Sequence, residues 1–290
     1  MPSDMVQQKL LNDAEMSPVE QEVVRNEVLT FMRDHNAAED PEYFPYGILN
    51  LTYRDAEGRP TRRKAKYWQV VAANHLLKKD AGRPFDQRRA SLLLAHEMGT
   101  GKTITAILTL AGVYRQMSWW RSSVAKRNPT TNQIEVPPEL KTVMIVPAGV
   151  LLKWEAEFRA WTTLGDRLLV ANTAAQLTKE AIDAALVLLV TPDALITALK
   201  TFAYDSENPD EDPNDTGDKK KKKVRQSNKL MRTRVQRRKD DKGQAVPAHP
   251  VFVMLNNGLA QLVVDELHLM YNPATWRGYI VALFAGRAKF

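Results

Sequence analysis

Apolar residues in this chain fall into short continuous runs that alternate with stretches of helical periodicity. Four such runs are at residues 91–95, 142–146, 185–190 and 261–264. A glycine-rich turn and a predicted helix from Lys102 follow the first run, and a helix around residues 151–160 follows the second. Alternation of this kind indicates a parallel sheet that is buried on both faces. Ligands of such sheets bind at the carboxyl ends of the strands, so the polar residues after each run are the candidates for chemistry.

The first 60 residues lack this alternation and are predicted to be an N-terminal extension. Ser17 can cap a helix, Pro18 suits its first position, and an apolar stripe over residues 24–32 follows helical spacing. Residues 1–60 hold 5 Lys and Arg against 12 Asp and Glu, a net charge of −7. We therefore expect an acidic, partly helical extension, followed by one α/β lobe over residues 61–290.

Two segments of that lobe interrupt the alternation and are predicted to be insertions. Residues 118–139 are rich in Ser, Asn, Thr and Pro and resemble a loop. Residues 204–248 have low complexity and are expected to be disordered, because they offer little apolar surface to bury. Within them, residues 205–218 carry only acidic charges and residues 219–239 only basic ones. The basic block is typical of a nuclear address or a nucleic-acid patch, and a spacer whose two blocks neutralise each other is the alternative.

Composition and charge narrow the class of protein. The chain has 290 residues, 44% of them hydrophobic and 26% charged, as in a globular protein. It has no cysteine, which excludes a disulfide scaffold, a zinc finger and a cysteine nucleophile. No apolar run approaches the roughly 18 residues of a membrane span, and no signal peptide is present, so we expect a soluble intracellular protein without a membrane partner. The whole chain has a net charge of +7, so the residues after the acidic extension carry +14. This excess favours a polyanionic partner, and an ordinary solvated surface is the alternative.

A phosphate-binding loop is the strongest chemical signal in the sequence. Residues 95–103 read Ala-His-Glu-Met-Gly-Thr-Gly-Lys-Thr and lie between an apolar run and a predicted helix. Glycines let the backbone N–H groups approach phosphate closely, and a helix N-terminus favours the anion. Lys102 would reach the β- and γ-phosphates, and the Thr103 hydroxyl would bind Mg²⁺. His96 stands where the general pattern has glycine. The predicted nucleotide-binding residues of the loop are Met98, Gly99, Thr100, Gly101, Lys102 and Thr103.

The fourth apolar run, residues 261–264, is followed by two adjacent acids, Asp265 and Glu266, and then by His268. Two carboxylates at the edge of a buried strand are costly unless a cation or hydrogen bonds compensate them. Asp265 would hold Mg²⁺, and Glu266 would polarise the attacking water as a general base. The alternative interpretation is a strand that simply ends in a polar cap.

Together these motifs resemble a known family. The sequence E-M-G-x-G-K-T and the sequence D-E-x-H at residues 265–268 are similar to motifs I and II of superfamily 2 helicases, specifically the Swi/Snf-type DNA translocases. Residues 142–158 are similar to motif Ia of that family, and residues 188–191 to motif Ib. Gln69 stands about 30 residues before the phosphate loop, where the family has a glutamine that reads adenine. The resemblance covers roughly residues 65–290.

The resemblance implies a RecA-like parallel sheet flanked by helices, with ATP and Mg²⁺ as ligands and Lys102, Asp265, Glu266 and His268 as catalytic residues. It implies double-stranded DNA, free or in chromatin, as the partner. Together with the basic block it implies the nucleus of a eukaryotic cell as the location, with the cytoplasm as the alternative. By analogy with motifs Ia and Ib, the contacts with nucleic acid are expected at Pro147, Ala148, Gly149 and Thr191. Trp154 and Phe158 in motif Ia are expected to pack a helix.

Several departures from the family pattern bear on activity. His96, Leu267 and Tyr271 replace the usual Asp, Ala and Lys, and none of these changes removes a catalytic group. The sequence ends at Phe290, before the position of motif III and of a second RecA-like lobe, which the family needs in cis or in trans. Turnover by this chain alone is therefore not expected. The alternatives are a non-catalytic nucleotide- or DNA-binding and docking module, and a lobe of an RNA helicase, against which the Trp and Glu-Phe of motif Ia argue.

Overall fold

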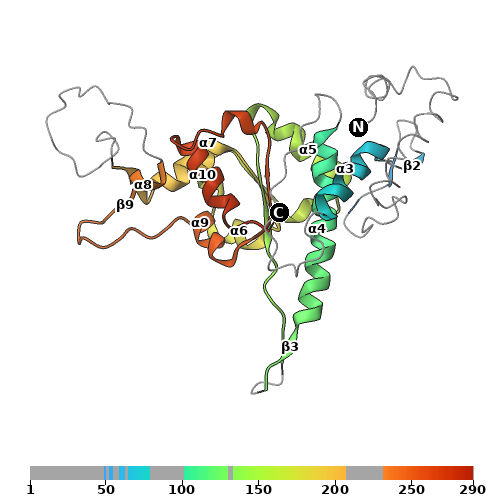
Figure 1. Cartoon of the computed structure of the whole chain (residues 1–290), viewed down its shortest axis with the longest axis horizontal. Helices are drawn as coiled ribbons and strands as arrows, with labels where there is room; N and C mark the ends of the chain where they lie inside the picture. Colours follow the sequence, from blue (N-terminus) through green and yellow to red (C-terminus); the bar gives the residue numbers. More distant parts are fainter. Residues whose placement is uncertain are drawn as a thin grey trace. The chain divides into compact units, whose positions relative to one another are not determined.

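The computed structural model describes residues 49, 52–54, 59–62, 65–78, 101–129, 133–206 and 231–289 (Figure 1). The chain divides into two compact units. The first holds residues up to Pro137 together with Ala156–Gly165 and Phe290, and the second holds Pro138–Glu155 and Asp166–Lys289. The predicted helix after Ser17 and the predicted strand at residues 91–95 lie outside the described residues.

A four-stranded parallel sheet forms the centre of the second unit. The strand order is β10 (Leu259–Val264), β5 (Lys141–Ile145), β7 (Val187–Val190) and β6 (Leu168–Ala171). The pairing register sets Ile145 beside Val190 on one side and beside Val264 on the other. Three of the strands fall on predicted apolar runs, which confirms the predicted parallel α/β sheet. Strand β6 was not predicted, because its four residues Leu-Leu-Val-Ala follow a segment without a clear period.

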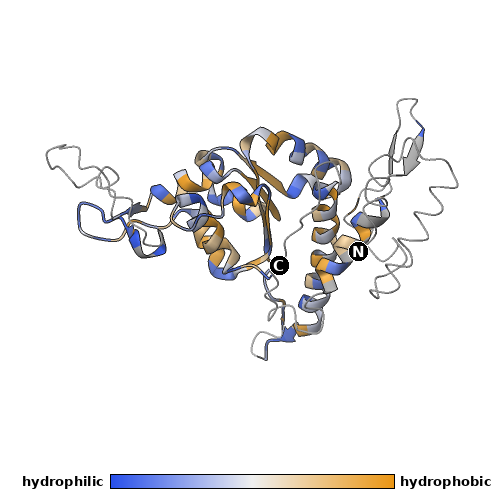
Figure 2. Ribbon diagram, turned by 45° about the horizontal axis from the view of Figure 1, so that its top comes forward, coloured by the Kyte–Doolittle hydropathy of each residue, from blue (hydrophilic) through white to orange (hydrophobic). Residues whose placement is uncertain are grey.

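Helices cover the sheet of this unit and build its core. Its helical elements are η4 (Ala148–Val150), the first half of α5 (Leu151–Trp161), η5 (Gly165–Arg167), η6 (Ala174–Gln176), α6 (Lys179–Ala184), α7 (Pro192–Lys200), α8 (Met231–Arg234), α9 (Pro250–Val253), η8 (Met254–Asn257), η9 (Leu267–Leu269) and α10 (Trp276–Ala285). Figure 1 shows α6, α7, α9 and α10 on one side of the sheet. Their apolar side chains pack on Val143, Ile145 and Leu188 of the strands, and Figure 2 shows the apolar residues gathered in this interior. The observed sheet and helices are those of a RecA-like α/β fold.

In the first unit, helix α3 (Tyr67–Lys78) packs against helix α4 (Lys102–Val124). The Leu77 side chain of α3 packs on Gly112 of α4, where an added Cβ would lie 2.2 Å from a methyl carbon of Leu77. Two short antiparallel ladders complete the described part of this unit, β1 (Thr52–Arg54) with β2 (Pro60–Arg62), and β3 (Lys126–Arg127) with β4 (Ile134–Glu135). None of the described helices is long and apolar enough to cross a membrane.

The predicted insertions contain more secondary structure than the sequence suggested. Helix α4 continues through residues 118–124, which hold neither glycine nor proline, and the loop begins only after Val124. In the second insertion, β8 (Ala203–Asp205) pairs with β9 (Val235–Arg237), and α8 leads into β9. The reason lies in the charges: the buried carboxylate of Asp205 from the acidic block forms an ion pair with Arg234 from the basic block. Residues 207–230 lie outside the described part of the chain.

Candidate functional site

The phosphate loop ends at Gly101, where helix α4 begins. Gly101 is the N-cap residue and has φ 80° and ψ 39°, a left-handed conformation that glycine adopts without a steric penalty. Lys102 and Thr103 are the first two residues of the helix and are partly exposed. The first backbone N–H groups of a helix have no partner inside it and favour an anion. Met98, Gly99 and Thr100 lie outside the described residues.

Gln69, predicted from its spacing alone, lies beside this loop end. Its side chain is buried in helix α3, and its Oε1 accepts a hydrogen bond of 2.9 Å from the backbone N–H of Lys66. Its Nε2 occupies the space beside Gly101, since a Cβ at Gly101 would come within 2.0 Å of that nitrogen. The first unit therefore brings the predicted glutamine to the residue that precedes Lys102.

The predicted acids lie in the second unit, at the carboxyl end of strand β10. The backbone N–H of Asp265 donates to the carbonyl of Ile145 at 2.9 Å, which extends the pairing with β5 to the acid itself. Both oxygens of the Asp265 carboxylate accept hydrogen bonds. Oδ1 accepts from the backbone N–H of Glu266 at 3.0 Å, and Oδ2 accepts from the indole N–H of Trp154 at 2.8 Å. The carboxylate is thereby held from two directions.

Glu266 has an unusual backbone conformation. Its φ is 51°, and it is the single non-glycine residue with positive φ in the described part of the chain. A side chain in this region costs roughly 1–2 kcal/mol, and such strain is concentrated at functional sites. The exposed carboxylate lies 3.1 Å from Nδ1 of His268. The turn after β10 therefore points the second acid into solvent and sets the predicted histidine beside it.

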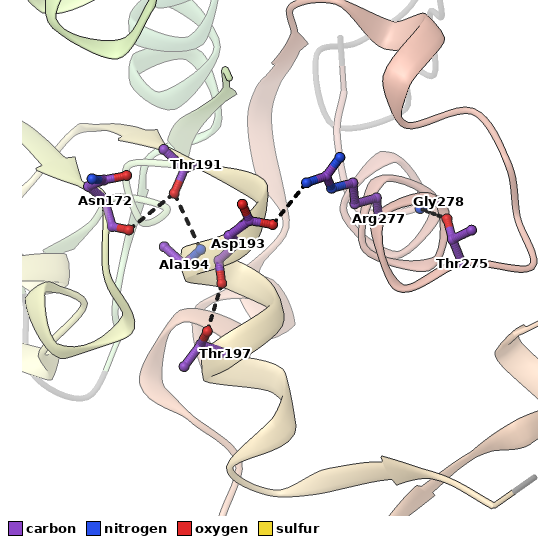
Figure 3. Close-up of polar contacts among 8 residues, drawn as sticks. All are labelled: Asn172, Thr191, Asp193, Ala194, Thr197, Thr275, Arg277 and Gly278. Atoms are coloured by element: carbon purple, nitrogen blue, oxygen red, sulfur yellow. Dashed lines mark hydrogen bonds and ion pairs between the residues drawn. The ribbon is translucent and has the colours of Figure 1, made fainter. Parts of the chain in front are cut away.

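The predicted nucleic-acid residues differ in exposure. Pro147, Ala148 and Gly149 follow the carboxyl end of β5 and lead into η4, with Ala148 and Gly149 exposed. A Cβ at Gly149 would meet no atom within 4 Å, so the space beside it is open. Thr191 is only 1% exposed. Its hydroxyl donates to the carbonyl of Asn172 and accepts from the backbone N–H of Ala194, both at 3.3 Å (Figure 3).

Thr191 is therefore the N-cap of helix α7, and its side chain is fully occupied inside the protein. The polar groups that reach the surface beside it belong to neighbours. Asp193 forms an ion pair of 3.2 Å with Arg277 at the start of helix α10, and Thr275 caps that helix (Figure 3). The amino ends of α7 and α10 are thus linked at their exposed side chains.

Three described arginines of the basic block, Arg234, Arg237 and Arg238, bond within the protein. Besides the ion pair of Arg234 with Asp205, Arg238 donates through Nε to the carbonyl of Lys200 at 2.9 Å. Arg237 donates to the carbonyl of Val246 at 3.0 Å, and its guanidinium lies over the ring of Phe202. These side chains hold the β8–β9 ladder to the lobe. The lysine run at residues 219–223 lies outside the described residues.

The Asp265 carboxylate fits a magnesium ion that is carried by a nucleotide. Mg²⁺ usually binds one or two carboxylates together with substrate phosphates and water, whereas Ca²⁺ needs a larger cage of protein oxygens. No group of three His, Cys, Asp or Glu side chains that could hold a metal by itself occurs among the described residues. Each Asp265 oxygen accepts one hydrogen bond and keeps a further lone-pair position.

Trp154 is the residue whose role the sequence reading missed. It is buried as predicted for a packing residue, but its indole N–H also bonds the candidate metal ligand. The sequence offered one indication of this second role, because the indole N–H of a buried tryptophan is usually hydrogen-bonded.

The sequence matches the model of a known protein family. The family model of the SNF2-related domain matches residues 25–277, which is most of the chain. None of the curated proteins compared with the chain matches it.

Proposed function

The chain belongs to the SNF2-related domain family, and on that premise we propose that it is the ATP-binding lobe of a motor driven along double-stranded DNA. The family is one of helicase-like ATPases of the Swi/Snf type. The observation that carries the proposal is the acid pair at the end of β10. Asp265 is restrained by two hydrogen bonds, and the adjacent Glu266 is held in a strained turn with its carboxylate in solvent.

Each residue has a distinct role in this proposal. The ammonium of Lys102 and the backbone N–H groups at the start of α4 bind the phosphates. The hydroxyl of Thr103 and the carboxylate of Asp265 are the protein's ligands for Mg²⁺. Bound Mg²⁺ would supply positive charge against the negative charge of the phosphoryl group in transfer. Glu266 orients the attacking water and accepts its proton, and His268 keeps the Glu266 carboxylate in place.

DNA binds, in this proposal, along the carboxyl edge of the sheet. The exposed backbone of Ala148 and Gly149 lets a phosphate oxygen approach without obstruction by side chains. Thr191 supports this edge as a helix cap and makes no contact of its own. The excess positive charge outside residues 1–60 would attract the polyanion.

Turnover and location complete the proposal. A second RecA-like lobe, in cis or in trans, would supply an arginine finger that is worth about 10³ to 10⁵ in rate, so the ATP-binding lobe by itself would bind ATP and hydrolyse it very slowly. The lysine run at residues 219–223 would act as a nuclear address, and chromatin would then be the natural form of the DNA.

Nucleotide binding by the wild-type chain and by the Lys102→Ala variant tests the proposal. Titration with a fluorescent ATP analogue in the presence of Mg²⁺ should give saturable binding that Lys102→Ala weakens at least tenfold. The same titration with labelled duplex DNA should show an affinity that falls steeply as salt rises, because phosphate contacts release counterions. Equal ATP affinity of the two proteins would contradict the assignment of the phosphate loop. Preference for duplex RNA over duplex DNA would favour the RNA helicase alternative.

A further inference from the structure

The hydrogen bond between Trp154 and Asp265 joins two motifs that are 111 residues apart in the sequence. Trp154 lies in the first turn of helix α5, directly after the segment proposed to contact DNA. Asp265 directly follows strand β10, and both residues belong to the same compact unit. The Nε1–Oδ2 distance is 2.8 Å, within the normal range of a bond from N–H to an ionised acceptor.

The bond is well placed to control the orientation of the carboxylate. An aspartate side chain turns about two bonds, and a single acceptor contact leaves it free to rotate. Here the backbone N–H of Glu266 holds Oδ1 and the indole holds Oδ2, so the plane of the carboxylate is defined by two donors. Trp154 is 4% exposed, so water cannot readily replace the indole as a donor. Packing alone would be served equally by phenylalanine, whereas only the indole supplies an N–H at this point.

We propose that Trp154 is a positioning residue, which holds the Asp265 carboxylate in the orientation that Mg²⁺ requires. This inference rests on the proposed function, in which Asp265 is a magnesium ligand. Hydrogen bonds to ligating carboxylates typically control metal affinity, and their loss costs about 10- to 100-fold. Trp154 therefore connects the helix that follows the DNA-contact segment to the metal ligand through one side chain.

The first test compares Trp154→Phe with Trp161→Phe. Trp161 ends the same helix and is partly buried, and its indole makes no hydrogen bond to a carboxylate of the described residues. The affinity of the full 290-residue chain for a fluorescent ADP analogue is measured across a series of Mg²⁺ concentrations. Nucleotide affinity should rise with Mg²⁺, and Trp154→Phe should increase the Mg²⁺ concentration that gives half of this rise by about tenfold. The nucleotide affinity measured without Mg²⁺ should stay unchanged. Trp161→Phe should match the wild type in both quantities.

The outcomes separate the two proposals. If Mg²⁺ does not strengthen nucleotide binding by the wild type, the role of Asp265 in the proposed function is wrong. If Mg²⁺ strengthens binding by the wild type and by Trp154→Phe with the same half-effect concentration, the positioning role of Trp154 is wrong. Thermal unfolding of both variants shows whether the substituted proteins remain folded.

A second measurement uses the wild type and so does not depend on how the variant folds. The indole N–H signal of Trp154 is assigned through its backbone in ¹⁵N-labelled protein and followed while Mg²⁺ is added to the ADP-saturated chain. The signal should shift with the Mg²⁺ titration, and Asp265→Asn should shift it in the absence of Mg²⁺, because the charge of the acceptor changes. The signal of Trp161 is the internal control. A Trp154 signal that is unmoved by both changes overturns the inference.

Discussion

The side-chain amide of Gln69 occupies the space in which a Cβ of residue 101 would lie, with its Nε2 only 2.0 Å from that position. Gly101 also has a φ of 80°, which side chains other than glycine rarely adopt. Two independent constraints therefore require glycine immediately before Lys102. One comes from the backbone of the phosphate loop, and the other comes from the packing of helix α3.

We expect Gly101→Ala to lower ATP affinity at least tenfold, because the loop must leave its left-handed conformation and Gln69 must move away. Titration with a fluorescent ATP analogue measures the loss. Gly149→Ala is the matched control, since the space beside Gly149 is open within 4 Å. The double variant Gln69→Ala/Gly101→Ala should regain at most part of the affinity, because it removes the close contact but keeps the unfavourable φ and loses the adenine contact predicted for Gln69. Wild-type affinity in Gly101→Ala would contradict this account.

The strain at Glu266 gives a prediction about stability. Glycine tolerates the φ of 51° at this position, whereas alanine retains the steric penalty of a Cβ. After allowance for the greater flexibility of glycine in the unfolded chain, Glu266→Gly should be more stable than Glu266→Ala by about 1 kcal/mol. Urea unfolding of the two variants measures the difference, and both lack the carboxylate and its contact with His268. A more stable alanine variant would show that the turn is not strained.

Sequence reasoning identified the elements that depend on local pattern. The apolar runs that form β5, β7 and β10 lie between polar residues and helices, so the sequence alone indicates that these segments are buried. The acids after β10 follow from the rule that ligands bind at the carboxyl ends of parallel strands, whereas Ala148 and Gly149 were predicted from the resemblance to motif Ia. Gln69 was placed by its distance from the loop, and its close approach to Gly101 agrees with that choice.

The contacts that escaped prediction join residues far apart in the sequence. The bond from Trp154 to Asp265 and the ion pair of Asp205 with Arg234 need three-dimensional neighbours that no local period encodes. Thr191 has two roles suggested by different signals. Its place in a motif predicted contact with nucleic acid, and its position before Pro192 makes it a helix cap with a buried hydroxyl.

The ion pair between Asp205 and Arg234 should stabilise the folded insertion strongly. Asp205 is almost fully buried, and removal of its carboxylate leaves the Arg234 guanidinium without its partner. We expect Asp205→Ala to lower the free energy of unfolding by about 3 kcal/mol. The exposed pair of Lys179 with Asp183 is the control, because water screens it, and Asp183→Ala should leave the stability unchanged. Similar effects of the two substitutions in urea unfolding would be the contrary result.

His249 gives the fold a dependence on pH. Its Nδ1 accepts a hydrogen bond from the backbone N–H of Val251 and so caps α9, which requires the neutral ring. Burial lowers the pKa of His249 below the usual histidine value of 6.5. The unfolded chain then binds a proton more readily than the folded one, so this contribution to stability is present above pH 6.5 and is lost as the pH falls through the folded-state pKa.

We therefore expect the free energy of unfolding to be lower at pH 5.5 than at pH 7.5, and His249→Asn to reduce that difference. Asparagine can still cap the helix but has no proton to gain. Other groups titrate in the same range, so the informative quantity is the difference between the two proteins at each pH. Parallel pH profiles of the wild type and His249→Asn would exclude His249 as the cause.

Substitutions at Thr191 and Gly149 distinguish a residue that stabilises the carboxyl edge of the sheet from a residue that lies beside bound DNA. The hydroxyl of Thr191 satisfies one backbone N–H of α7 and donates to Asn172, so Thr191→Val should lower the free energy of unfolding by about 1 kcal/mol. Because the side chain is buried, DNA affinity of the folded variant should stay at the wild-type value. Gly149→Asp should do the reverse, since it adds a negative charge in open space beside the proposed phosphate contact and disturbs no packing.

Fluorescence anisotropy with labelled duplex DNA, together with urea unfolding of each variant, measures both effects. The salt dependence gives a further check, because a variant that loses a phosphate contact should show a shallower fall of log affinity with log salt. Gly149→Asp is expected to show that change and Thr191→Val is not. A large loss of DNA affinity in a fully folded Thr191→Val protein would mean that this hydroxyl leaves its cap to meet the DNA. The edge of the sheet would then rearrange on binding rather than act as a preformed surface.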